Sequence, residues 1–140
     1  MARKYLPLRG EGKEFRLRLT VGGQRNLKAR FGEDTLQTVL LAAGDSERMC
    51  ALLTEALNWP GSENSLTNGE ELYDLLVDWG WQGQERFGAL ALDLACAGGL
   101  MTEAQTRQVK QTLHTAMEEA FSHMEEQVQQ EGESGPFPKG

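Results

Sequence analysis

The sequence predicts a mainly α-helical fold, with a short N-terminal β-strand or hairpin followed by about six helices, the last of them long. Apolar residues alternate with polar ones only near the N-terminus, which is typical of a strand. Farther along, apolar residues recur every three to four positions, and glycines or capping residues separate these runs. The chain has 140 residues, 39% of them hydrophobic and 25% charged, so it is long enough for one globular domain.

Alternation near the N-terminus predicts a strand at residues 14–20 with one apolar and one basic face. The alternating residues are Phe15, Arg16, Leu17, Arg18 and Leu19. A second short strand is expected at residues 5–8, across a turn at residues 9–12. Because an isolated hairpin is only marginally stable in water, it should pack on the helices or pair with another chain.

Six helices should follow the hairpin, each ended by a glycine, a proline or a capping residue. Apolar spacing places them at residues 21–31, 36–43, 46–57, 68–79, 87–97 and 103–128. Thr20 is expected to cap the first helix. The pairs Thr67 with Glu70 and Thr102 with Gln105 have the spacing of capping boxes, in which each side chain binds the backbone N–H of the other residue.

The expected domain organisation is a basic arm at residues 1–13, a single helical domain with the strand element at 14–128, and a disordered tail at 129–140. The last helix has a thin apolar stripe and is otherwise rich in Glu and Gln. Because this stripe extends farther than one small core can cover, the helix should project into solvent or lie along a partner.

Charge is divided unequally along the chain. The first 30 residues carry a net charge of +7 and the remainder −14, which gives −7 overall. Opposite charges on one chain favour contact with a second copy or with a partner of complementary charge. The candidates for self-association are Phe15, Arg16, Leu17 and Arg18. Nucleic-acid binding is disfavoured, because the acidic remainder would repel phosphates and no recognition helix or stacking platform is present.

No motif typical of an active site, a cofactor site or a metal site occurs in the sequence. His114 and His123 are nine residues apart, not at the i, i+4 spacing that chelates a metal on a helix. Cys50 and Cys96 lie in apolar helical patterns, which favours core packing over a disulfide. We therefore expect no catalytic residue, no cofactor and no metal. Without a long apolar run or an apolar leader, we also expect a cytoplasmic protein that does not bind membranes.

Two groups of apolar side chains are candidates for partner binding. Met117, Phe121 and Met124 form an adaptable surface on the last helix, which can pack within the chain or contact a partner. Trp79 and Trp81 flank a helix break, where large aromatic residues commonly fill the core and can also anchor a partner. The sequence alone leaves both alternatives open for both groups.

The order of features across residues 14–106 resembles the tail assembly chaperones of long-tailed phages, prophages and gene transfer agents. The resemblance rests on the strand and helix at 15–32, the segment at 68–78 and the segment at 87–105. The opening of the first helix departs from the family, because Gly22 and Gly23 stand where an apolar and acidic opening is expected.

This resemblance implies a non-enzymatic, self-associating chaperone in the cytoplasm of a bacterial host cell. Such a chaperone binds the tape measure protein and keeps it soluble while the tail tube protein assembles around it. In many such systems a slippery site near the end of the gene yields a longer product by frameshifting, and codons for Phe137, Pro138 and Lys139 can contain one. The competing hypothesis is a small helical adaptor or DNA-associated regulator that uses the basic N-terminal region.

Overall fold

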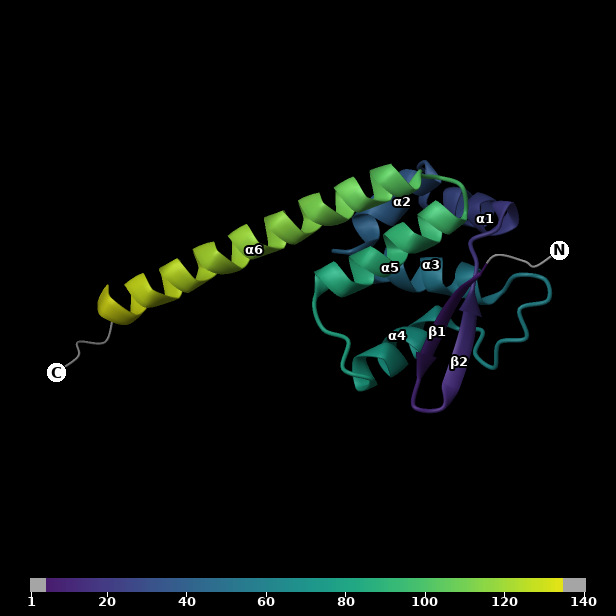
Figure 1. Ribbon diagram of the computed structural model, residues 1–140, viewed down its shortest axis with the longest axis horizontal. Helices are drawn as coiled ribbons and strands as arrows, with labels where there is room; N and C mark the ends of the chain where they lie inside the picture. Colours follow the sequence, from purple (N-terminus) through teal and green to yellow (C-terminus); the bar gives the residue numbers. More distant parts are fainter. Residues whose placement is uncertain (1–4, 135–140) are drawn as a thin grey trace.

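The computed structural model describes residues 5–134, and for residues 127–134 it describes the helical backbone alone. Within these residues it confirms the predicted fold class, a two-stranded antiparallel hairpin followed by six helices, the last one long (Figure 1). The strands are β1 (Leu6–Gly10) and β2 (Lys13–Leu17). The helices are α1 (Val21–Phe31), α2 (Thr35–Ala42), α3 (Ser46–Leu57), α4 (Gly69–Asp78), α5 (Gln84–Ala97) and α6 (Glu103–Ser134).

The hairpin combines a tight turn with an apolar face that covers the helices. Glu11 and Gly12 have positive φ angles of 47° and 77°, as in the two-residue turns that match the twist of paired strands. Leu8 lies opposite Phe15 in the register, and both side chains are buried. The second strand expected at residues 5–8 is therefore present as β1, within the segment 1–13 that was expected to form a basic arm.

The second strand ends three residues earlier than predicted, at Leu17. The N–H of Arg18 donates instead to the carbonyl oxygen of Ala56 on α3, at 3.0 Å. Chain direction changes here because the backbone is bound to a helix rather than to the neighbouring strand. The next helix begins as predicted, since the Oγ1 of Thr20 accepts the N–H of Gly23 at 3.1 Å.

α3 is the central helix of the core. It packs against α1, α2, α4, α5 and β2, which cover it on several sides. Its buried residues are Met49, Ala51, Leu52, Leu53, Ala56 and Leu57. Phe15 and Leu17 of the hairpin belong to the same cluster, as do Leu72 and Leu76 of α4. Each fully buried side chain of this kind contributes about 1.5–3 kcal/mol, so this cluster is the main source of stability.

One of the two predicted capping boxes is confirmed and the other is wrong. Before α6, the Oγ1 of Thr102 accepts the N–H of Gln105 at 3.1 Å, and the Gln105 side chain accepts the N–H of Thr102 at 3.0 Å. Before α4, the capping residue is Asn68, whose Oδ1 accepts the N–H of Glu70 at 2.8 Å. The predicted role of Thr67 fails because α4 begins one residue later than that box requires.

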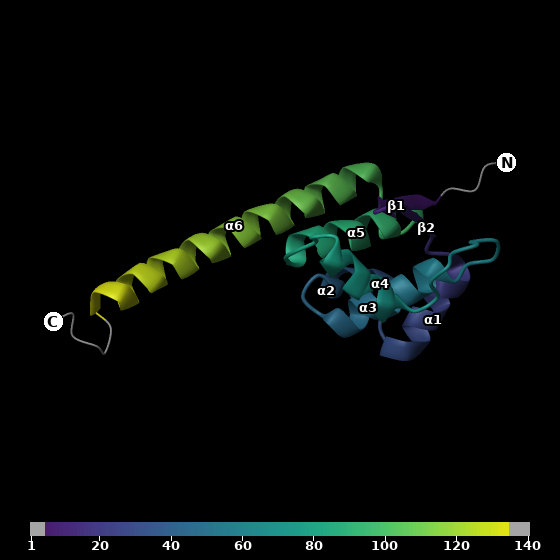
Figure 2. The same ribbon diagram turned by 90° about the horizontal axis from the view of Figure 1, so that it is seen from below.

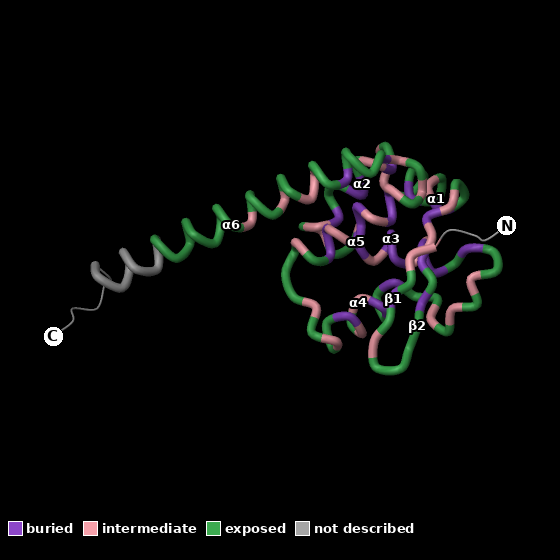
Figure 3. Tube along the Cα trace, viewed as in Figure 1, coloured by how far each residue is buried: buried purple, intermediate pink, exposed green. Residues whose placement is uncertain are grey.

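α6 packs against α5 over its first half and leaves the globule over its second half (Figures 1 and 2). Leu113 fits over Gly88 of α5, where an added Cβ would lie only 2.7 Å from the Leu113 side chain. Every residue from Glu118 to Glu126 is exposed (Figure 3). The helix continues past residue 128, the predicted end of the domain, to Ser134. Of the predicted disordered tail, residues 135–140 lie outside the described residues.

Candidate functional site

An apolar stripe on α6 begins in the core and continues into solvent. Leu113 contacts α5 at Gly88, and Met117, about one turn farther along, is half-buried. Phe121 and Met124 are each 57% exposed. Because residues three and four positions apart share a face of a helix, these side chains form one row. The candidate site residues on α6 are therefore brought together, and the outer two face solvent.

The two sides of this stripe differ in chemistry. Glu118 and Glu125, seven residues apart, lie along one side of the row, and Ala116 and Ala120 lie along the other. Between residues 111 and 134 the sequence has six Glu and no Lys or Arg. The stripe is thus apolar at its centre, acidic along one edge and formed of small residues along the other.

His114 lies where α6 separates from α5. Its Nδ1 is 2.5 Å from a carboxylate oxygen of Glu85 on α5, and its Nε2 is 2.9 Å from Glu118 on α6. The hydrogen bond to Glu85 and the negative charge of Glu118 raise the pKa of His114. About one turn earlier, Lys110 of α6 pairs with Asp93 of α5 at 2.5 Å. Such exposed pairs are individually weak, so they orient α6 on α5 rather than stabilise the globule.

The two tryptophans predicted as candidates pack against the core. Trp79 stacks on Phe15 with ring centroids 6.3 Å apart, and an added Cβ at Gly10 would lie 2.5 Å from its ring. Trp81 contacts Phe87 with ring centroids 5.5 Å apart. Both tryptophans are half-buried, and they hold the hairpin and the N-terminal part of α5 in place. They are not part of the α6 stripe.

Two of the residues predicted to mediate self-association belong to the core. Phe15 is 1% exposed and Leu17 is fully buried, because the apolar face of β2 covers the helices. The prediction is therefore corrected for these two side chains. Arg16 is exposed on the other face of β2, and Arg18, which follows the strand, is half-buried.

Side chains from a distant loop close the outer edge of β2. The N–H of Arg16 donates to Asn64 Oδ1 at 2.8 Å. The carbonyl of Arg16 accepts from Asn64 Nδ2 at 2.8 Å and from Trp59 Nε1 at 3.0 Å. The guanidinium groups of Arg16 and Arg18 lie over the rings of Tyr5 and Trp59, at 5.2 and 5.7 Å from the ring centroids. This position on β2 is therefore already bound within the chain.

Several basic residues of the N-terminal region have acidic partners. The ion pairs are Arg9 with Glu14, Lys28 with Asp34, and Arg30 with Glu47. Arg3 and Lys4 lie outside the described residues. These exposed pairs are individually weak, and they place a carboxylate beside three of the nine N-terminal cations that could contact a phosphate backbone.

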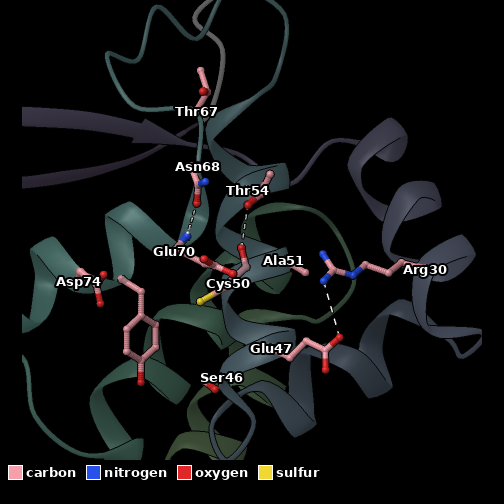
Figure 4. Close-up of a pocket in the computed structure, with 11 residues that line it drawn as sticks. Arg30, Ser46, Glu47, Cys50, Ala51, Thr54, Thr67, Asn68, Glu70 and Asp74 are labelled. Carbon is pink, nitrogen blue, oxygen red and sulfur yellow. Dashed lines mark hydrogen bonds and ion pairs between the residues drawn. The ribbon is translucent and has the colours of Figure 1, made fainter.

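A groove of about 750 Å³ lies between α3 and α4 (Figure 4). The two helices approach closely at Gly69, where an added Cβ would lie 2.0 Å from the carbonyl oxygen of Cys50. Burial, reinforced by the charges of Glu70 and Asp74, raises the pKa of the Cys50 thiol. A raised pKa keeps the thiol protonated at neutral pH and therefore a weak nucleophile.

A second groove, of about 1050 Å³, lies between β1, the end of α5 and the start of α6. Pro7 and Met101 line it together with Cys96 and Lys110. The sequence did not indicate this groove, because its walls come from three separate segments without a common motif. Cys50 and Cys96 are both free thiols and half-buried, so each lines a groove where full core burial was expected.

Among the side chains that the structure describes, those of residues 5–126, no group of three or more His, Cys, Asp or Glu is arranged to hold a metal ion. Across the described helices, which end at Ser134, none combines the length and the hydropathy that a membrane span requires. No protein-family model matches the chain, and comparisons with curated proteins and with solved structures find no match.

Proposed function

We propose that this chain is a non-catalytic tail assembly chaperone of a phage or prophage. It would bind the tape measure protein and assist assembly of the tail tube protein in the cytoplasm of the bacterial host cell. The observation that carries this proposal is the projecting half of α6, where Phe121 and Met124 are each 57% exposed on a stripe that begins in the core. The resemblance of residues 14–106 to that family supports the same function.

The physical basis is coverage of apolar surface on a long helical partner. Exposed apolar stripes make such a partner prone to aggregate before its own assembly is complete. A helix that is held at one end and solvated at the other can lie along such a stripe. Met117 and Met124 suit this role, because unbranched thioether side chains adapt to irregular surfaces. The chain contributes a net charge of −7, which favours solubility.

The first test is the DNA downstream of the codons for Phe137 to Lys139. We expect a slippery heptamer, an overlapping frame and then a very long gene that encodes a helical protein. Unrelated metabolic or regulatory genes at that position would overturn the proposal.

The second test is co-expression of the chain with that long helical protein. The paired substitutions Phe121→Asp and Met124→Asp should leave the partner insoluble, whereas the unchanged chain should keep it in the soluble fraction. As a matched control, Thr115→Asp with Ser122→Asp adds the same two charges on the opposite face of α6. Equal rescue of the partner by both variants would contradict a role for the stripe, provided that circular dichroism shows both variants folded.

The alternative, a DNA-associated regulator or adaptor, has less support because Arg9, Lys28 and Arg30 already have acidic partners. It requires a complex with DNA whose affinity falls steeply with salt concentration. A gel shift at low salt separates the two functions: a retarded band favours the regulator, and its absence removes that alternative.

A further inference from the structure

We infer that the projecting half of α6 selects a partner helix that is apolar along one face and basic beside that face. This inference rests on the proposed function, because it specifies the partner chemistry at the same stripe. It makes a narrower claim, namely that charge beside the stripe decides which helices bind.

The shape of the surface favours a helix as the partner. The segment from Glu118 to Ser134 spans about 25 Å at 1.5 Å per residue. Its described apolar side chains follow one row along that axis, so an elongated partner contacts more of the row than a compact one does. Ala116 and Ala120 beside the row allow the axis of a second helix to approach closely.

The charge beside the stripe restricts which helix can bind. Glu118 and Glu125 lie along one side of the row, and no Lys or Arg occurs between residues 111 and 134. A partner with Lys or Arg seven residues apart places a cation against each carboxylate. Glu118 already accepts from His114 through Oε1, and a carboxylate accepts further hydrogen bonds through its second oxygen.

The projecting half of α6 in a second copy is a poorer occupant. It contributes the same acidic edge and no Lys or Arg between residues 111 and 134, so association of the two halves brings carboxylates together without compensation. A separate basic helix has no such cost. The stripe is therefore better matched to a basic helix than to the projecting half of a second α6.

The experiment compares two synthetic peptides of three heptads that share one leucine stripe and differ only beside it. One peptide has Lys at the flanking positions and the other has Glu. Binding of each labelled peptide to the full chain is measured by fluorescence anisotropy. We expect about tenfold tighter binding of the Lys peptide, because two exposed ion pairs replace two repulsions, and this preference should shrink as salt is added.

A charge reversal at matched positions assigns the preference to one edge of the helix. Glu118→Lys with Glu125→Lys should reverse it in favour of the Glu peptide. The control variant, Glu119→Lys with Glu126→Lys, makes the same charge change on the face away from the stripe and should retain the preference for the Lys peptide.

Several outcomes would overturn the inference. The inference is wrong if the two peptides bind equally or if neither binds. It is also wrong if the control variant reverses the preference as the Glu118→Lys and Glu125→Lys variant does. Sedimentation that shows self-association of the chain, lost in the Phe121→Asp and Met124→Asp variant, would assign the stripe to a second copy instead. The inference and the proposed function can also fail separately. If the unchanged chain shows no peptide preference, while its Phe121→Asp and Met124→Asp variant fails to keep the long helical partner soluble, the inference is rejected and the proposed function stands.

Discussion

The two halves of α6 place one apolar stripe in two environments. In the first half, Val109 and Leu113 are half-buried beside α5. In the second half, Phe121 and Met124 are each 57% exposed, and Figure 3 shows this part of α6 extending away from the globule. The spacing of apolar residues is alike in both halves, so this spacing alone does not determine which side chains are buried. The outer part of the stripe contributes little to folding and is therefore available for a partner.

The largest contrast is expected between two phenylalanines. Phe15→Ala should lower the free energy of unfolding by about 3–5 kcal/mol, because it leaves a cavity in the core. Phe121→Ala should change that free energy by no more than about 0.5 kcal/mol, since the side chain is largely solvated. Urea unfolding followed by circular dichroism measures both. Similar losses for the two variants would contradict the projecting position of the second half of α6.

Two glycines should respond to the same substitution with opposite signs. An added Cβ at Gly69 would lie 2.0 Å from a backbone oxygen of α3, so Gly69→Ala should destabilise the fold by about 1–3 kcal/mol. At Gly22 the nearest atom lies 3.7 Å from an added Cβ. Gly22→Ala should therefore stabilise α1 by up to about 1 kcal/mol, through helix propensity. Thermal unfolding of both variants measures the difference, and an unchanged midpoint for Gly69→Ala would contradict the close contact of α3 with α4.

These glycines also show which parts of the fold the sequence could predict. The hairpin and the order of the helices were predictable, because alternation, apolar spacing and the Thr102 cap are local signals. The start of α4 was not, because Thr67 and Asn68 are adjacent and both able to cap. When Asn68 caps the helix, Gly69 is its first residue and packs against α3. The end of β2 likewise depends on a bond from Arg18 to a helix far away in the sequence.

The candidate site was predictable only in part, for a related reason. The spacing of apolar residues predicts the α6 stripe, but no local sequence signal indicates where α5 stops covering it. That point depends on Gly88, which receives Leu113 and is not distinguished in the sequence from other glycines. Alternation also gave the two faces of β2, yet Phe15 and Leu17 were assigned to self-association although their face is the one that the helices cover.

The start of α6 offers a smaller test of how the first half is held. Thr102→Ala removes one partner of the confirmed capping box and should cost about 1 kcal/mol. Amide hydrogen exchange should accelerate in the first turn of α6. Thr112→Ala serves as the control, because its hydroxyl only bonds back to the carbonyl of Gln108 in the same helix, and this change should be nearly neutral. Equal protection of the first turn in both variants would contradict a stabilising role for the cap.

The smallest effect is expected at His114, where the two halves of α6 meet. Its pKa is raised above the ordinary value of 6.5, first by the hydrogen bond to Glu85 and then by the charge of Glu118. Because the folded state favours the protonated imidazole, this contribution is fully present below the ordinary value and decreases as pH rises through the raised value. The NMR titration midpoint of His114 should lie above 6.5, and Glu85→Gln should lower it. A midpoint at or below the ordinary value in the unchanged chain would contradict the bridge between α5 and α6. If the bridge is present, hydrogen exchange near Glu85 should quicken with pH by more than the intrinsic rate, while the α3 core stays protected.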